Sequence, residues 1–97
     1  MATNYITPAY VKHVTVYGTS TTINDGNFAT FSIPYSEEGY ECYPIAAGEY
    51  RTIKGWYIHY KDMSPNQCIF DYINNTGSTI IGAKPWVMYL CITQTVY

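Results

Sequence analysis

The sequence predicts an all-β fold, and three observations support this prediction. The chain has five Val, eleven Ile, twelve Thr and twelve Tyr residues, whereas Leu90 is its one leucine. Side chains branched at Cβ lose rotamer freedom in a helix but pack well on a pleated sheet. Apolar and polar residues also alternate along several segments, which is the two-residue period of a strand.

The length and composition predict one folded domain. The chain has 97 residues, of which 47% are apolar. This length is close to a typical domain of about 100–150 residues, and the apolar fraction exceeds that of disordered chains. We therefore expect a single antiparallel β-sandwich over residues 1–97, jelly-roll-like, with about six to eight short strands separated by turns.

The first predicted strand covers residues 11–17 and follows an extended lead-in over residues 1–9. Val14 and Val16 share one face of this strand, and polar or aromatic side chains occupy the other. A polar connection over residues 18–27 comes next, with no strand expected inside it.

The second predicted strand covers residues 28–33. It begins after Asp25 and Gly26, a pair that is favoured in tight turns. Its alternation places Phe31 and Ile33 on one face.

Two longer strands follow. Residues 40–47 predict a strand interrupted by Pro44, which cannot donate a ladder hydrogen bond and therefore belongs at an edge, bulge or bend. Residues 53–61 predict a strand with Tyr57 and His59 on one face and larger apolar side chains on the other.

Residues 67–74 predict a strand with Cys68, Phe70 and Tyr72 on one face, and Ile80 begins a short strand. The last strand, residues 86–95, is apolar on both faces. One face carries Trp86, Met88, Leu90 and Ile92, and the other carries Val87, Tyr89 and Cys91. Such a strand lies inside a stack or under a partner chain, so we expect the first set to pack in the core or between subunits.

The charge content excludes a nucleic-acid binder that works by neutralising phosphates. Only 12% of the residues are charged and the formal net charge is −2, with five Lys and Arg scattered along the chain. No export signal is recognisable at the start, and no apolar stretch reaches the roughly 20 residues of a membrane-spanning helix. We therefore expect a soluble chain that folds in the cytoplasm of the cell that makes it.

The three cysteines form no metal or redox motif. Cys42, Cys68 and Cys91 are far apart in the sequence, and each lies in an apolar segment. Two interpretations remain open: three reduced, buried thiols, which is favoured, or one disulfide with a leftover thiol. No His–Asn pair marks any of them as a catalytic nucleophile.

No catalytic or metal-binding constellation is visible, so we expect neither enzymatic activity nor a cofactor. The acidic residues are dense only at Glu37, Glu38 and Glu41, where a solvated loop is favoured over a calcium site. His13 and His59 lie on different predicted strands and are more typical of surface or structural residues than of a zinc pair.

Aromatic residues are the informative feature, since they make up 18% of the chain. A core of this size cannot satisfy twelve buried phenol hydroxyls, so several tyrosines are expected to face solvent or a partner. Tyr is also favoured at contact surfaces, because it is large and stiff with a polar tip. Tyr50, Tyr57 and His59 are the expected contact residues.

The order of several short motifs resembles one group of known domains. These motifs are FATFSIP at 28–34, GYECYPI at 39–45, FDYINNTG at 70–77 and VMYLCI at 87–92. They resemble the small β-sandwich domains of bacteriophage tail-fibre, baseplate receptor-binding and head-fibre proteins. In those domains the residue corresponding to Tyr40 is architectural and is not a ligand contact.

The resemblance implies a non-enzymatic virion structural protein that assembles as a homotrimer beside other virion proteins and contacts host-surface glycans. A capsid-decoration or head-fibre protein without a receptor is one alternative, and a stand-alone bacterial carbohydrate-binding module is another. Those domains usually follow a long fibrous shaft, whereas about ten residues precede the first strand here. An excised domain and a free-standing virion protein both fit this difference.

Overall fold

The computed structural model describes residues 11–93, and every regular element in that range is a β-strand. The strands are β1 (Val11–Tyr17), β2 (Thr21–Ile23), β3 (Phe28–Ser32), β4 (Tyr40–Glu49), β5 (Trp56–Ser64), β6 (Gln67–Asn74), β7 (Ile80–Ala83) and β8 (Pro85–Thr93). The predicted all-β, antiparallel class is therefore confirmed. The predicted lead-in over residues 1–9 lies outside the described residues.

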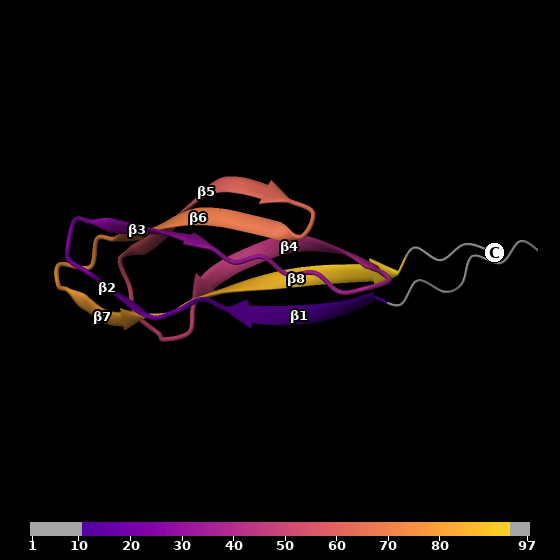
Figure 1. Cartoon of the computed structure of the whole chain (residues 1–97). Helices are drawn as coiled ribbons and strands as arrows, with labels where there is room; N and C mark the ends of the chain where they lie inside the picture. The colour runs from indigo at the N-terminus through magenta and orange to yellow at the C-terminus, as the bar shows by residue number, and fades with distance from the viewer. Residues whose placement is uncertain (1–10, 94–97) are drawn as a thin grey trace, which may run out of the picture.

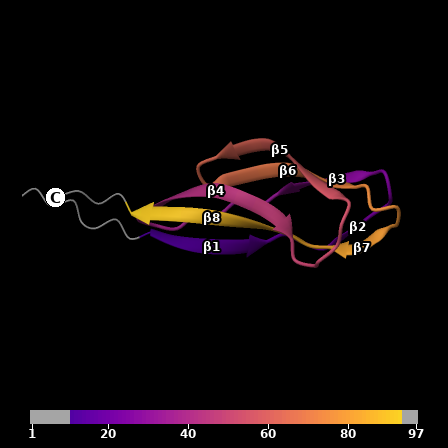
Figure 2. The same ribbon diagram turned by 180° about the vertical axis from the view of Figure 1, so that it is seen from behind.

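The strands form three antiparallel sheets, in the orders β1-β8-β4, β2-β7 and β3-β6-β5 (Figure 1). Three of the pairs are nested: β1 pairs with β8, β2 with β7, and β3 with β6. This nesting is the folded-back ribbon of a jelly roll, which divides eight strands between two sheets. Here β4 joins β8 and β5 joins β6, so that the ribbon ends in separate three-stranded sheets, which Figure 2 shows from behind.

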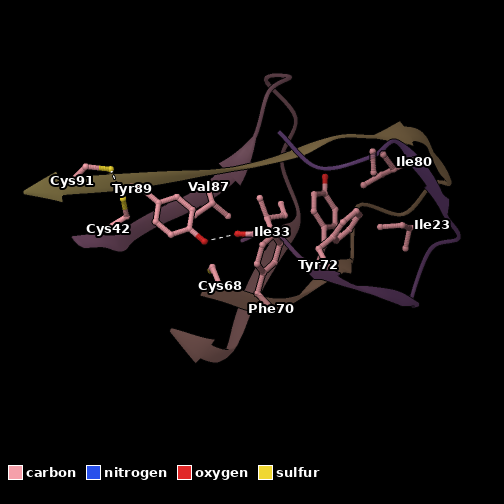
Figure 3. Close-up of a cluster of buried hydrophobic side chains, with 12 residues drawn as sticks. Ile23, Ile33, Cys42, Cys68, Phe70, Tyr72, Ile80, Val87, Tyr89 and Cys91 are labelled. Atoms are coloured by element: carbon pink, nitrogen blue, oxygen red, sulfur yellow. Dashed lines mark hydrogen bonds between the residues drawn. The ribbon is translucent and has the colours of Figure 1, made fainter. Parts of the chain in front are cut away.

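The two three-stranded sheets and the β2-β7 pair share one buried core, which is a sandwich-like arrangement (Figure 3). Each strand of the larger sheets contributes alternate side chains to it. The fully buried members include Phe70 and Tyr72 from β6, Val87 and Tyr89 from β8, and Ala83 from β7. The predicted alternation of residues 67–74 is confirmed, and the face shared by Phe31 and Ile33 lies in the core.

The two fully buried tyrosines both have partners for their hydroxyl groups. Tyr72 donates a hydrogen bond to the buried carboxylate of Glu49, and Tyr89 donates one to the carbonyl oxygen of Ile33. Burial raises the pKa of both phenols well above the usual value. A buried hydroxyl without a partner costs about 1–3 kcal/mol, so these bonds are what allows tyrosine in the core.

The two faces of the last strand differ in burial. Val87, Tyr89 and Cys91 are the buried face of β8. The four residues expected to pack in the core or between subunits lie on the outer face and are half-buried, so they are not part of the buried core: Trp86, Met88, Leu90 and Ile92. Because both faces of β8 are apolar, the sequence pattern does not show which of them is buried in the core. Subunit packing remains a prediction for the outer set.

The structure adds a short strand that was not predicted and confirms the expected place of Pro44. The connection over residues 18–27 contains β2, whose Ile23 is 2% exposed in the core. A three-residue strand is too short to show a period. Pro44 lies where expected, because the β4–β8 register shifts between Pro44 and Ala46.

Candidate functional site

The outer face of the β3-β6-β5 sheet brings two predicted contact residues together. Tyr57 and His59 alternate along β5 with Trp56 and Ile58, which pack against the core. Tyr57 and His59 therefore point outward, and both are exposed. The strand period thus places them as neighbours on one surface.

An apolar row crosses this face at Tyr57. The register places Phe28 of β3 and Tyr57 of β5 on either side of Ile73 of β6. Phe28 is 61% exposed and Tyr57 is 56% exposed. Strands lie about 4.8 Å apart, so the outer two backbones of this row are roughly 10 Å apart. We call Phe28, Ile73 and Tyr57 the aromatic strip.

A polar row lies directly beside the aromatic strip. The register aligns Thr30, Asp71 and His59 across the three strands. Thr30 Oγ1 donates to Asp71 Oδ1 at 2.6 Å, and His59 Nδ1 lies 3.6 Å from Asp71 Oδ2. Lys61 Nζ lies 3.9 Å from the same carboxylate. We call Thr30, Asp71, His59 and Lys61 the polar row.

The carboxylate of Asp71 is held in its charged form. The hydrogen bond from Thr30 is the largest cause and lowers the pKa of Asp71. Partial burial comes second and raises the pKa, while the Lys61 charge and the contact with His59 lower it, and the net shift is downward. Asp71 is therefore a fixed hydrogen-bond acceptor beside exposed aromatic rings.

Tyr50 does not belong to this surface, although its exposure is similar at 54%. It lies in the β4–β5 connection, directly after the last residue of β4. Its ring centroid is 5.4 Å from the guanidinium carbon of Arg51. Tyr50 is thus separated from the other two predicted contact residues.

A hollow of about 440 Å³ lies next to Arg51. Its lining combines aliphatic and hydroxyl side chains with two cations: Arg51, Ile53, Lys54, Thr76, Ser78, Thr79, Ile80 and Ile81. Arg51 Nη1 donates to the carbonyl oxygen of Ile81 at 2.9 Å, and Nη2 lies 3.7 Å from the buried Glu49 carboxylate. The guanidinium thus already has an anionic partner.

The outer face of the β1-β8-β4 sheet has a different character. Along the central strand β8 it presents four large apolar side chains, Trp86, Met88, Leu90 and Ile92, which we call the apolar face. The flanking positions are mixed: Leu90 lies between His13 and Tyr43, and Glu41 flanks Ile92, but Val11, Tyr17, Ala46 and Gly48 also flank this row. An apolar centre is typical of the core of a protein–protein interface.

The acidic segment and the histidines form no shared metal site. Glu37 accepts hydrogen bonds from Lys12 and Tyr35, and the Lys12 bond is the main cause that lowers the pKa of Glu37. His13 lies on β1 and His59 on β5, on the outer faces of different sheets. Within residues 11–93, no group of three or more His, Cys, Asp or Glu side chains could hold a metal ion.

Five members of the aromatic strip and the polar row were not predicted from the sequence: Phe28, Thr30, Lys61, Asp71 and Ile73. The sequence did contain a signal for Phe28. Phe28, Thr30 and Ser32 occupy alternate positions along the strand, so Phe28 is an aromatic side chain on an otherwise polar face. Asp71 could not be found in this way. Its position beside His59 depends on the pairing of β5 with β6.

No protein-family model, curated protein or solved structure matches this chain. In the described part of the chain, residues 11–93, no helix has the length and apolar character needed to cross a membrane.

Proposed function

We propose that this chain is a non-enzymatic binding protein that holds a glycan on the outer face of its β3-β6-β5 sheet. The observation that carries the proposal is the aromatic strip beside the polar row. Exposed aromatic rings stack on the C–H faces of sugar rings, and a few fixed polar groups then orient the ligand. The roughly 10 Å between the strip's outer strands is close to the length of a disaccharide unit.

The polar row supplies the groups that sugar hydroxyls need. The ionised carboxylate of Asp71 accepts hydrogen bonds, and the exposed Lys61 ammonium donates them. Since Asp71 already has Thr30 as a partner, its geometry is set before a ligand arrives. Such preorganisation lowers the entropy that binding must overcome.

In this proposal the protein is a virion component of a bacteriophage, of the tail-fibre or receptor-binding type, and the glycan belongs to the host surface. The support is the sequence resemblance. Each of its four motifs coincides with a strand of the fold, namely β3, β4, β6 and β8.

The proposal includes self-assembly through the apolar face. The four central side chains of that face are half-buried in a single chain, and a second copy of the chain packed on the face would cover the apolar surface that they still expose. We expect a homotrimer, as the resemblance implies. The aromatic strip lies on the other sheet and stays open in such an assembly.

A glycan array tests the binding proposal. It should carry bacterial lipopolysaccharide and capsule fragments together with simple β-linked oligosaccharides. We expect wild-type protein to bind a subset of them, and Phe28→Ala and Tyr57→Ala each to weaken binding about tenfold, since an aromatic contact contributes about 1–1.5 kcal/mol.

Tyr50→Ala is the matched control, because Tyr50 is as exposed as Tyr57 but lies off the sheet face. It should bind like the wild type, and all three variants should melt within a few degrees of it. Equal losses in Tyr50→Ala and Tyr57→Ala would contradict the assigned surface. No binding by the wild type to any glycan would contradict the function and favour a capsid-decoration role.

A further inference from the structure

Two of the three cysteines face each other across neighbouring strands. Cys42 of β4 and Cys91 of β8 are directly opposite in the antiparallel register. Both are fully buried, and their Sγ atoms are 2.8 Å apart (Figure 3). They are 49 residues apart in the sequence, so only the fold brings them together.

The backbone at this position has the geometry that a cross-strand disulfide requires. The carbonyl oxygen of Cys42 accepts a hydrogen bond from the amide of Asn66, at 2.7 Å, in the β5–β6 turn. The carbonyl and amide of one strand residue point to the same side, so Cys42 directs both away from β8. Cys42 and Cys91 therefore form a non-hydrogen-bonded pair, in which opposite Cα atoms are about 4.5 Å apart. Disulfides span Cα separations of about 4.4–6.8 Å.

The third cysteine lies outside this cross-strand pair, and we expect it to stay unpaired. Cys68 lies on β6, in the facing sheet (Figure 3). Packed sheets are about 10 Å apart, whereas cysteines with Cα atoms more than about 7 Å apart cannot be bridged without backbone movement.

We propose that Cys42 and Cys91 form a redox-active pair that closes into a disulfide when the chain meets a small-molecule disulfide such as glutathione disulfide, leaving Cys68 as the free thiol. The thiolate of one cysteine attacks a glutathione sulfur, which forms a mixed disulfide and releases one glutathione. The thiolate of the other then attacks the protein sulfur of the mixed disulfide and releases the second glutathione. Two protein thiols are oxidised, and one glutathione disulfide is reduced to two glutathione molecules.

Burial determines when this reaction occurs. The thiolate is the attacking species, and burial raises the pKa of Cys91 to about 12. The reaction therefore requires β4 and β8 to part, as they do in the unfolded chain. Once formed, the bond joins the C-terminal strand of the core to β4 and projects inward, so it leaves both outer faces unchanged.

Refolding in a redox buffer tests the proposal. Full-length protein is reduced and unfolded in urea, then refolded with glutathione and glutathione disulfide. The sample is quenched with acid, and its free thiols are alkylated with iodoacetamide under denaturing conditions before the intact mass is measured. We expect one alkylated thiol per wild-type chain, none for Cys68→Ala and two for Cys42→Ala. Peptide mapping should find Cys42 joined to Cys91.

A second measurement separates the bond from a folding defect in a variant. Oxidised wild type and oxidised Cys68→Ala should melt roughly 10 °C or more above their reduced forms, because a long loop is closed. The melting temperature of Cys42→Ala should not respond to reductant. Three alkylated thiols in the wild type after refolding, or a disulfide that contains Cys68, would overturn the proposal.

Discussion

Asp71 is the residue on which the polar row depends, because three neighbouring side chains converge on its carboxylate. Thr30 donates the shortest of these contacts, at 2.6 Å. His59 Nδ1 lies 3.6 Å from the carboxylate, and the Lys61 ammonium lies 3.9 Å from it. Since the site is at the surface, the ion pairs contribute little to stability. Their effect is to keep an acceptor ionised and in place.

Replacement of Thr30 by Val tests this description of Asp71. The hydrogen bond from Thr30 is the largest cause of the lowered pKa, so Thr30→Val should raise the pKa of Asp71 toward its ordinary value. An NMR titration of the side-chain carboxyl carbon measures this shift. Thr15→Val, on the outer face of the other sheet, is the control and should leave the titration unchanged.

The sign of the pH effect follows from the same shift. A carboxyl whose folded pKa is depressed stabilises the fold above its unfolded pKa of about 3.9, and the contribution is lost as the pH falls through the folded value. Wild type should therefore lose more stability than Thr30→Val between neutral pH and pH values below 4. Identical pKa values of Asp71 in the two proteins would refute the assigned hydrogen bond.

At the level of elements, the β4–β5 and β6–β7 connections pack together through a glycine. Gly55 has φ of 90°, and its carbonyl accepts a hydrogen bond from the amide of Asn75 at 2.7 Å. A Cβ on Gly55 would lie 2.8 Å from the Asn75 carbonyl oxygen. Both the backbone angle and the space at this position therefore require glycine.

Gly77 provides a matched comparison, because its φ is 88° but a Cβ there would meet no atom within 4 Å. We expect Gly77→Ala to lower the free energy of unfolding by about 1–2 kcal/mol, which is the cost of the left-handed backbone alone. Gly55→Ala should cost a further 1 to 3 kcal/mol, roughly the range for steric overpacking. Urea denaturation measures both, and equal losses would show that the two connections do not pack as described.

The strands were predictable where one face is apolar and the other polar. In β6, alternation placed Cys68, Phe70 and Tyr72 together on one face, and the structure shows that this is the buried face. In β8 both faces are apolar, and the choice between them is made by tertiary partners such as the carbonyl that accepts the Tyr89 hydrogen bond. Sequence alone does not show such partners.

The site was partly predictable for the same reason. The strand period placed Tyr57 and His59 on one face, which the structure confirms. Their neighbours Phe28 and Asp71 come from other strands, and only the register of the sheet aligns them. Tyr50 was included as a residue at a strand end, and it lies in the connection directly after β4, apart from the other two.

At the scale of the whole molecule, the fold presents two outer faces of opposite character. The β3-β6-β5 face combines exposed rings with charged groups, whereas the centre of the β1-β8-β4 face is an uninterrupted apolar strand. We propose that the β3-β6-β5 face is open for a ligand and that further copies of the chain cover the β1-β8-β4 face. A disulfide between Cys42 and Cys91 would lie inside the core and would therefore change neither of these outer faces.

The molar mass in solution, measured by light scattering at micromolar concentration, tests this claim most directly. Leu90 lies at the centre of the apolar face, so Leu90→Glu places a charge where the copies would meet. Ile81→Glu is the control, because Ile81 is 73% exposed and lies on β7, outside that face. If the chain is a homotrimer, wild type and Ile81→Glu should each have a molar mass of about three times 11.1 kDa, and Leu90→Glu should have a molar mass of 11.1 kDa. A wild-type protein that is already a monomer of 11.1 kDa would contradict it.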